Sequence, residues 1–592
     1  MSETLSPRLP LTPAQAAMRD GHLQDPQSSA YSQAQIVWYS GENLTEEVLV
    51  EAFNRGLREC ETLLLKCGVD ESGNWYQQFD PAEEIPMTRI DLTGEGDPRA
   101  AALTIADREI RRALQISGPE LPFRSYLFVL GEHSFGWLLV CHHVVIDGYG
   151  ANLLRSRVGE ILAALVNGND VPDCRFGRIA EMIAVVPEPD PADLEFWRQH
   201  LEGAPEVISF ADRVVPPAPL HSMIDVLTPD FVARVAETLD GVNWAHVAAA
   251  AAIGYVSVLV ENPTVVVGLP VTGRFAPEEK ITPSQSMGAL PLHLTVDHSA
   301  PLPELVRLFQ TTFRSTRNHQ RQAPHTLRAE LPVAWRTGRI YGPMINVIPF
   351  EVPSTAGSLE SGLEVIDQGP IDDIAMTMIP GPDNGIRTKF LFNPDLYGPQ
   401  ARQEHADRLG RWLEQIVENT SAILADLVCL TEDEEKFHSE LEATAAAGEP
   451  SPLGWREPCT VADLAAAAGV AGASGISVRS ALGRPSVIGS PGRVTLHSPR
   501  GEHRTDLLVA LRRDGAIEYR GKSSDRVAVN GSWVELEGVR NALARDARCA
   551  GAEISVSERR ITVRLGRDSG GVDRADVSRL IGEVTAAPVV VR

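Results

Sequence analysis

Residues 137–150 read Trp-Leu-Leu-Val-Cys-His-His-Val-Val-Ile-Asp-Gly-Tyr-Gly, an apolar run that delivers two adjacent histidines and then an Asp-Gly pair. The run predicts a buried strand, and the apolar pattern that starts near Ala151 predicts a helix. Because side chains alternate between the faces of a strand, His142 and His143 should point in opposite directions, with Cys141 on the face of His143. A neutral imidazole held by a neighbour can act as acid, base or hydrogen-bond donor near neutral pH. The stretch therefore predicts that one histidine faces a cleft.

The Asp147-Gly148 pair predicts the turn that joins this strand to the helix. An aspartate can fix such a turn by accepting hydrogen bonds from backbone amides or by pairing with an arginine. A glycine lets a substrate or a backbone segment approach closely. The pair would therefore shape the edge of the cleft.

The composition is that of an ordinary soluble globular protein. The chain has 592 residues, of which 43% are hydrophobic and 22% are charged, and this length predicts two to four domains. It has no run of about 18 apolar residues, so we expect no membrane-spanning segment. The net charge of −25 argues against general nucleic-acid binding.

The seven cysteines are scattered along the chain, without a Cys-x-x-Cys pair. An odd number of unclustered cysteines favours reduced thiols over disulfides or a zinc site. Residues 1–11 lack the basic and apolar regions of a signal peptide. We therefore expect a cytoplasmic protein without a bound metal.

The spacing of His142, His143, Asp147 and Gly148 resembles the HHxxxDG motif of nonribosomal peptide synthetase condensation domains, which belong to the chloramphenicol acetyltransferase-like acyltransferases. Other stretches resemble further motifs of this family, and the late ones are closest to starter-type domains, which take an acyl donor. These stretches are residues 9–18, Phe196-Trp197-Arg198-x-x-Leu201, Gly268-x-Pro270-Val271-x-Gly273-Arg274, Pro291-Leu292, residues 341–350 and Gly369-Pro370-Ile371-Asp372-Asp373. The resemblance covers about residues 9–430.

The resemblance implies an α/β fold of two chloramphenicol acetyltransferase-like lobes that form a V-shaped pseudo-dimer. The N-lobe would span residues 1–185 and the C-lobe residues 186–435, with the histidine motif at their junction. A tunnel open at both faces would admit two phosphopantetheine arms, each supplied by a partner carrier protein. We expect no cofactor to bind to the chain itself.

The resemblance also implies the catalytic set, which is His143, His142, Asp147 and Gly148. His143 would lie beside the attacking amine and either take its proton or position it. His142 would pack inward on the opposite strand face. Asp147 would hold the loop so that His143 points into the channel.

The channel residues that we expect are Cys141, Tyr149, Gly288, Asn346 and Arg274. Cys141 is either a nucleophile or a packed strand cysteine, and the second is favoured because the donor is already a thioester. Gly288 stands where the family commonly has Asn, and Asn346 is the candidate polar group opposite His143. Arg274 either pairs with a buried carboxylate or is a solvated turn arginine.

Residues 59–64 depart from the family pattern. They read Glu-Cys-Glu-Thr-Leu-Leu where the family usually has Arg-His-Glu-x-Leu-Arg. Glu61 and Leu63 match, but both arginines and the histidine are missing. The departure argues against a salt bridge from this helix to the Asp147 loop.

The end of the chain has a different character. Residues 436–475 are rich in Ala, Gly and Pro and predict a linker. Residues 483–496, 504–507, 515–527 and 531–538 resemble segments of adenylation domains, but the phosphate loop with Pro-Lys-Gly and the late Gly-Lys are missing. We therefore expect residues 476–592 to be a small, truncated α+β adenylation-like domain without an ATP site.

The leading functional hypothesis is a condensation enzyme. It would form an amide bond between a carrier-tethered acyl or aminoacyl thioester and an amine, which is free or bound to a second carrier. The alternatives are a catalytically inactive carrier-docking scaffold and an ester-forming or epimerising relative. The two histidines exclude a heterocyclising domain, in which aspartates replace them.

An arginine-rich stretch at residues 307–339 predicts a docking surface for an acidic carrier, or else a solvated amphipathic helix. Its arginines are Arg307, Arg314, Arg317, Arg321, Arg328, Arg336 and Arg339.

Overall fold

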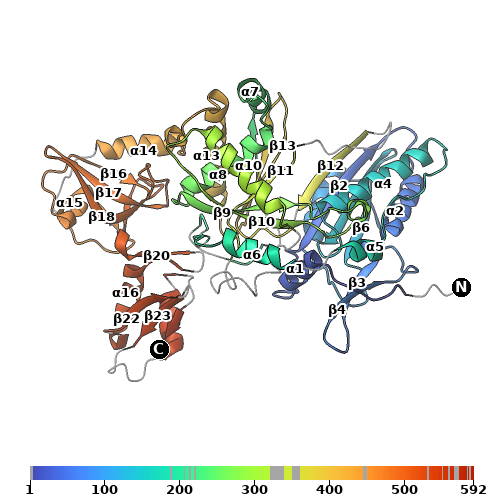
Figure 1. Ribbon diagram of the computed structural model, residues 1–592, viewed down its shortest axis with the longest axis horizontal. Coiled ribbons are helices and arrows are strands. Elements are labelled where there is room, and N and C mark those ends of the chain that lie inside the picture. Colours follow the sequence, from blue (N-terminus) through green and yellow to red (C-terminus); the bar gives the residue numbers. More distant parts are fainter. Residues whose placement is uncertain are drawn as a thin grey trace.

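The computed structural model places three parts one after another along the long axis of the molecule (Figure 1). We call them the N-lobe (residues 5–186 and 360–367), the C-lobe (190–349 and 369–430) and the C-terminal region (431–591). The described residues are 5–591 without 187–189, 206, 208, 212–214, 219–221, 321–338, 350–359, 368, 444–449, 530–531, 550, 558–559, 566–572, 583 and 586–588.

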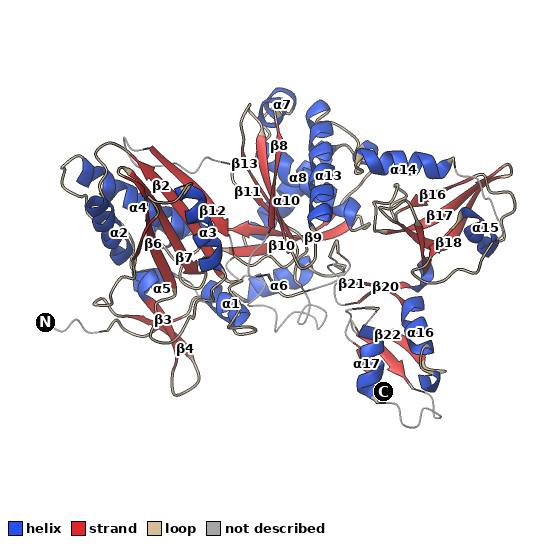
Figure 2. Ribbon diagram, turned by 180° about the vertical axis from the view of Figure 1, so that it is seen from behind, coloured by secondary structure: helices blue, strands red, loops and turns tan. Residues whose placement is uncertain are grey.

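The N-lobe is a layered α/β structure around a five-stranded sheet. Its elements are β1 (Leu9–Pro10), α1 (Pro13–His22), β2 (Ser32–Ser40), α2 (Glu46–Glu59), β3 (Leu65–Val69), β4 (Trp75–Phe79), β5 (Thr88–Asp91), α3 (Pro98–Ile110), β6 (Phe123–Gly131), β7 (Ser134–His142), α4 (Gly148–Val166), α5 (Ile179–Val185) and, from later in the chain, β12 (Glu360–Asp367). The strand order is β12-β2-β7-β6-β5, and β5 runs parallel to β6. Helices α2 and α4 lie on one side of the sheet and α3 on the other (Figure 2).

The apolar pattern of the N-lobe follows from these layers. Strand β7 is central and covered on both faces, so residues 135–142 are all buried and nearly all apolar. On α2, Leu49, Phe53 and Leu57 are buried at helical spacing. Phe53 stacks on Trp137 of β7 with ring centroids 4.5 Å apart. Burial of one such side chain contributes about 1.5–3 kcal/mol, so this layer contact stabilises the strand that carries the histidines.

The C-lobe is a second α/β layer structure, with the strand order β10-β9-β11-β13-β14-β8. Its elements are α6 (Pro191–His200), β8 (Ser222–Thr228), α7 (Phe231–Thr238), α8 (Trp244–Leu259), β9 (Thr264–Val271), α9 (Pro277–Ile281), β10 (Gly288–Thr295), α10 (Leu302–Arg317), β11 (Met344–Val347), β13 (Ile374–Pro380), β14 (Ile386–Phe392) and α13 (Pro399–Glu418). Strand β11 is parallel to both of its neighbours, and the other pairs are antiparallel.

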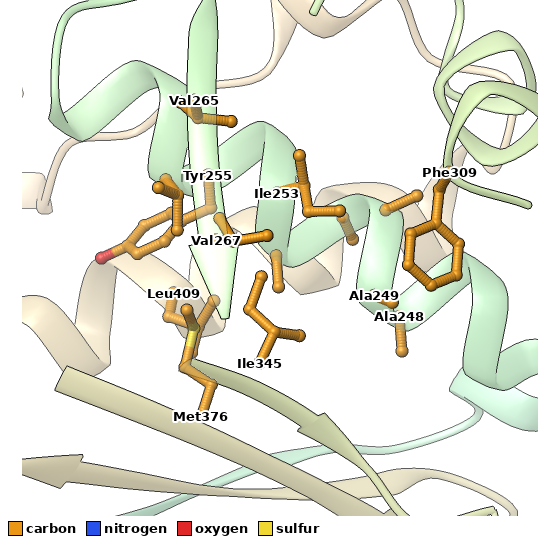
Figure 3. Packing of buried hydrophobic residues seen from close by; sticks show 14 of the residues in the cluster. Ala248, Ala249, Ile253, Tyr255, Val265, Val267, Phe309, Ile345, Met376 and Leu409 are labelled. Atoms are coloured by element: carbon orange, nitrogen blue, oxygen red, sulfur yellow. The ribbon is translucent and has the colours of Figure 1, made fainter. Parts of the chain in front are cut away.

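The alanine-rich helix α8 forms the centre of the C-lobe core. Residues 247–256 of this helix are all buried, since small side chains let it pack closely against the sheet, α10 and α13. Figure 3 shows Ile253 and Tyr255 of α8 among Ile345, Met376 and side chains from the neighbouring helices.

Strand β12 connects the two lobes. It lies between C-lobe elements in the sequence but pairs antiparallel with β2 of the N-lobe, with Leu363 opposite Val37. In Figure 1 it is the yellow strand beside the blue β2. Strand β2 lies between β12 and β7 in the sheet, and Gly369, which follows β12, lies against His143, which follows β7.

The C-terminal region contains a five-stranded antiparallel sheet of order β15-β19-β18-β17-β16, followed by a smaller α+β unit. Its elements are α14 (Glu432–Glu442), β15 (Pro458–Cys459), α15 (Val461–Ala468), β16 (Gly475–Arg479), β17 (Pro491–Ser498), β18 (Gly501–Leu511), β19 (Ile517–Lys522), β20 (Arg526–Val529), β21 (Ser532–Glu535), α16 (Leu536–Ala544), β22 (Glu553–Ser557), β23 (Arg560–Arg564), α17 (Arg574–Gly582) and β24 (Val589–Val591).

The prediction of a linker at residues 436–475 is wrong for residues 436–442 and 461–468, which are helical. Helix α15 buries Val461 and Leu464 in the same core as β16–β18, and Leu441 of α14 joins this core. Thr460 and Asp463 form a capping box that starts α15. The alanine content suggested a flexible linker, but alanine has the highest helix propensity. Here a cap and an apolar partner surface stabilise the helix.

No helix in the described part of the chain is long and apolar enough to span a bilayer. All seven cysteines are free, and five of them are buried.

Candidate active site

Asp147 lies at the N-terminus of α4, where it is completely buried. Its Oδ1 accepts a hydrogen bond from the backbone N–H of Gly150 at 2.8 Å. This is an N-cap contact, which satisfies one of the backbone donors that a helix start leaves unpaired. The Asp-Gly pair in the sequence therefore marks a helix cap as well as a turn.

Arg274 of the C-lobe forms a two-contact ion pair with Asp147. Its Nη1 lies 2.9 Å from Oδ2 and its Nη2 lies 3.1 Å from Oδ1, and both side chains are excluded from solvent. The planar guanidinium matches the carboxylate, so the pair has a fixed orientation as well as strength. The prediction that Arg274 pairs with a buried carboxylate is confirmed, and the solvated alternative is wrong.

A turn of the C-lobe completes the shell around Asp147. The backbone N–H groups of Ser286 and Met287 each donate to Oδ2 at 2.9 Å, and the Asp147 N–H donates to Ser284 O at 3.2 Å. Gly150 makes this approach possible, because a Cβ at that position would lie 2.9 Å from Ser284 N. The side chain of Asp147 thus joins the two lobes.

His143 lies directly after β7, half-buried where the lobes meet. Its backbone N–H donates to Tyr31 O at 2.7 Å, and its Nδ1 lies 3.4 Å from Oε1 of Gln285, a C-lobe residue. Gly369 follows β12 and lies against the other ring edge, since a Cβ on Gly369 would be 2.5 Å from His143 Nε2. The imidazole is therefore held between N-lobe backbone and two C-lobe segments.

His142 is the last residue of β7 and is buried, as strand alternation predicts for the inward-facing histidine. Its Nδ1 accepts from the backbone N–H of Val144 at 3.0 Å, so its Nε2 carries the proton and donates to Nδ1 of His22 at 3.3 Å. The ring of Tyr31 stacks on it with centroids 6.4 Å apart. His142 supports the loop from inside the N-lobe.

The two buried histidines predict a pH-dependent stability. Burial lowers the pKa of His142 well below its usual range, and burial also lowers the pKa of His22, partly offset by Asp25. The unfolded chain binds protons at these imidazoles below about pH 6.5, whereas the folded protein does not. We therefore expect the melting temperature to fall from pH 7.5 to pH 5.5.

The His22→Gln variant, whose amide can still accept from His142, should show a smaller fall in melting temperature between these pH values. The exposed His133 offers a matched control, and His133→Gln should fall as much as the unmodified protein. An equal fall in all three proteins, measured by thermal denaturation, would contradict the role of the buried pair.

Gly369 offers a second test, because a side chain at this position would displace the His143 ring. Its φ of +97° is unfavourable for any residue with a Cβ, and the added carbon would meet the His143 ring. Gly369→Ala is therefore expected to displace the imidazole and lower product formation more than it lowers the melting temperature. Gly398→Ala is a control without neighbours around the added carbon. Unchanged turnover of Gly369→Ala would show that the ring position is not critical.

Cys141 differs from its predicted place. It is 2% exposed and packs in the apolar core between the sheet and the helices of the N-lobe, and burial raises its pKa well above the usual range. Alternation would place it beside His143 only if the strand continued, but β7 ends at His142 and the chain turns. Cys141 is a core residue, and a buried neutral thiol is a poor nucleophile.

Gly148 and Tyr149 lie at the start of α4, on the same turn as Asp147. Gly148 is exposed, and a Cβ there would meet no atom within 4 Å. Tyr149 is half-buried, its hydroxyl donates to Lys280 O at 3.2 Å, and the Arg274 guanidinium lies 4.5 Å from its ring centroid. Tyr149 therefore covers the ion pair, and Gly148 leaves open space beside it.

Gly288 and Asn346 lie in the C-lobe sheet. Gly288 begins β10 directly after Met287, whose N–H binds Asp147, so it belongs to the junction. Asn346 is half-buried on β11, beside Thr377 of β13. Its place opposite His143 stays a prediction.

The acidic residues of stretch 59–64, which departs from the family pattern, form ion pairs away from the Asp147 loop. Glu59 pairs with Arg157 of α4 at 2.6 Å, and Glu61 pairs with Arg178 at 3.0 Å. The cation that Asp147 receives comes instead from Arg274, across the junction.

The predicted docking stretch is only partly described. Arg307, Arg314 and Arg317 are exposed on α10, and Arg339 pairs with Asp373 at 2.9 Å. Arg321, Arg328 and Arg336 lie outside the described residues.

Sequence reasoning did not single out four residues that contact the histidines, namely His22, Tyr31, Gln285 and Gly369. Gly369 stands in a quoted motif, and its glycine was the available signal. Gln285 lies outside the motif residues and belongs to no spacing pattern, and Tyr31 acts mainly through its carbonyl, which any residue supplies.

Comparisons with known proteins agree on one family. The model of the condensation domain matches residues 6–437. A dimodular nonribosomal peptide synthase of Bacillus subtilis (strain 168) is 27% identical over 458 residues, which cover 75% of this chain and 19% of that protein. An isonitrile lipopeptide synthase of Streptomyces coeruleorubidus is 29% identical over 403 residues, which cover 66% of this chain and 27% of that protein. The chain thus matches about a fifth to a quarter of these relatives.

Solved structures show the same fold. The first condensation domain of the calcium-dependent antibiotic synthetase, in complex with a substrate analogue, has a TM-score of 0.65 and 26% identity and covers 72% of this chain and 100% of its own. The starter condensation domain of rhizomide synthetase, in complex with C8-CoA and Leu-SNAC, has a TM-score of 0.65 and 24% identity and covers 72% of this chain and 98% of its own.

A matching family model over most of the chain thus coincides with a histidine motif whose aspartate and second histidine both contact the neighbouring lobe. The chain belongs to the condensation-domain family of nonribosomal peptide synthetases, whose members are acyltransferases that form amide bonds.

Proposed function

We propose that this chain catalyses amide-bond formation between a carrier-tethered acyl thioester and an amine. The single observation that carries the proposal is His143, which is half-buried at the lobe junction and contacts Gln285 in the C-lobe turn that also binds Asp147. The amine nitrogen attacks the thioester carbonyl, the carbon–sulfur bond breaks, and the donor thiol leaves with a proton.

His143 acts on the attacking amine. An imidazole at this point can accept the amine proton, or it can hold the amine by a hydrogen bond while the tetrahedral intermediate forms. Asp147 does not touch the reacting atoms, since all described hydrogen bonds of its carboxylate are with Arg274 and backbone N–H groups. It is a positioning residue.

We propose that the two lobes are a chloramphenicol acetyltransferase-like pseudo-dimer and that the donor is an acyl group, as in starter-type domains. The two separate sheets and the bridging strand β12 support the first proposal. The motif-like residues 341–350 and 369–373 support the second.

The C-terminal region is proposed to be a truncated adenylation-like domain without an ATP site. Its support is the resemblance of residues 483–496 and 504–507 to adenylation segments, together with the missing phosphate loop in the sequence. Incubation with ATP, each amino acid and labelled pyrophosphate is the test, and amino-acid-dependent exchange would overturn the proposal.

The partners are proposed to be a donor carrier protein and, for a tethered amine, an acceptor carrier. Their phosphopantetheine arms would bring both substrates to the junction, so the chain itself would need no bound cofactor. A reducing compartment such as the cytoplasm fits the seven free thiols.

The competing functions are a carrier-docking scaffold, an ester-forming enzyme and an epimerase. The contacts of His143 with Gln285 and with the Tyr31 carbonyl argue against the scaffold, because a decayed site has no need for an oriented histidine. A hydroxyl acceptor would give an ester at the same site.

The test is reconstitution of the purified chain with a carrier loaded with acyl thioesters of different lengths. Amino acids, free and on a second carrier, and hydroxy acids serve as acceptors. Mass spectrometry identifies amide and ester products, and chiral chromatography of the amino acid released from the carrier detects inversion. Amide formation that requires the chain supports the proposal. An unchanged donor thioester with every acceptor would favour the scaffold. An ester product would favour the ester-forming enzyme, and an inverted aminoacyl group on the carrier would favour the epimerase.

A further inference from the structure

Gln285 is a buried amide that links His143 to the C-lobe. It is 2% exposed and lies between Ser284 and Ser286, in the turn that also surrounds Asp147. Its Nε2 donates to Met287 O at 3.0 Å, which fixes the orientation of the amide. The oxygen Oε1 therefore faces Nδ1 of His143, at 3.4 Å.

This orientation favours one of the two tautomers of the imidazole. An amide oxygen can only accept, so a hydrogen bond with Gln285 requires a proton on Nδ1 of His143. In the neutral imidazole the lone pair then lies on Nε2. This is the ring edge that faces Gly369, away from the Gln285 turn.

From the amide geometry we infer that Gln285 is a positioning residue that selects the tautomer of His143 with the proton on Nδ1 and the lone pair on Nε2. The inference rests on the proposed function, in which His143 acts on the amine. Gln285 does not touch the substrate, and it acts through the orientation and tautomer of the histidine.

The same turn holds Asp147 and His143, and this connects the tautomer to the association of the lobes. Ser286 N–H binds the Asp147 carboxylate one residue after Gln285. The amide of Gln285 is therefore at the correct distance from the imidazole only while the C-lobe turn sits on the Asp147 loop. Separation of the lobes removes the acceptor and releases the tautomer preference.

The first test reads the tautomer directly, by nitrogen NMR of the full chain with labelled histidine. The His143 signals are identified as those missing from His143→Ala. The wild type is expected to show a protonated Nδ1 and an unprotonated Nε2 for neutral His143. A proton on Nε2 would overturn the inference, and this result requires neither activity nor a folded Gln285 variant.

The second test uses Gln285→Met, which keeps side-chain length but removes the acceptor. We expect a mixture of tautomers and a fall in kcat of about two- to ten-fold, the range that one lost hydrogen bond gives, with KM nearly unchanged. The control is Gln310→Met, which breaks another glutamine–histidine contact, to His246 at 3.0 Å, on α10. It should leave kcat and the His143 signals unchanged.

The tests of the role of Gln285 can be distinguished from the test of the proposed acyl transfer. An unchanged His143 tautomer in a folded Gln285→Met protein overturns the role of Gln285, whatever the activity. Absence of any acyl-transfer product from the wild type overturns the proposed function, while the NMR result still decides which nitrogen is protonated and whether Gln285 causes it.

Discussion

Asp147→Ala is expected to lower the free energy of unfolding of the condensation lobes by about 3–5 kcal/mol and to abolish product formation. The substitution leaves the Arg274 guanidinium buried without its counter-charge. It also removes the acceptor for the N–H groups of Gly150, Ser286 and Met287. Thermal and urea denaturation measure the stability change.

Arg274→Ala should lose stability by a similar amount, because it leaves the carboxylate uncompensated. The double variant should be less unstable than the sum of the two single variants, since they remove one shared interaction. Arg111→Ala is the matched control: it breaks a two-contact pair with Asp107 that is about half exposed, and such pairs contribute about 0–1 kcal/mol. Equal effects of Arg274→Ala and Arg111→Ala would contradict the structural role of the junction pair.

His143→Ala is expected to lower turnover by about 10²- to 10⁴-fold, the usual range for loss of a proton-transfer group. The side chain is half-buried, so the melting temperature should stay close to that of the unmodified protein. Turnover of a loaded carrier and thermal denaturation are measured on the same preparation.

His142 gives the opposite pattern and serves as the internal control. Loss of its ring leaves the N–H of Val144 and the Nδ1 of His22 without their partner, so His142→Ala should lower the melting temperature. If His142→Ala were stable and inactive while His143→Ala were unstable, the roles of the two histidines would be reversed.

The local structure around the histidines could be predicted because it depends mainly on residues that are adjacent in the sequence. The apolar run predicted the strand, Asp-Gly predicted the turn after it, and alternation together with the family resemblance predicted that His142 packs inward. The prediction that Cys141 lies on the face of His143 failed because alternation applies only up to the last strand residue, whereas the favoured interpretation of a packed strand cysteine is confirmed. His143 follows the strand end, and its direction depends on Tyr31 and on the C-lobe.

Contacts between distant segments were harder to predict. The sequence left two possibilities for Arg274, because the distance of 127 positions between it and Asp147 says nothing about their separation in space. The role of Gln285 could not be predicted for the same reason, since the sequence does not show that its amide lies beside His143. The linker prediction failed because composition does not show that α15 has an apolar surface to pack on.

The most direct test of the account is a single-turnover experiment with a carrier loaded with an acyl thioester and an amine acceptor. The wild type should convert the thioester to an amide, and a correctly folded His143→Ala should do so about 10²- to 10⁴-fold more slowly. Amide formation at the same rate by both proteins, with equal carrier loading, would contradict the claim that His143 at the lobe junction performs the reaction.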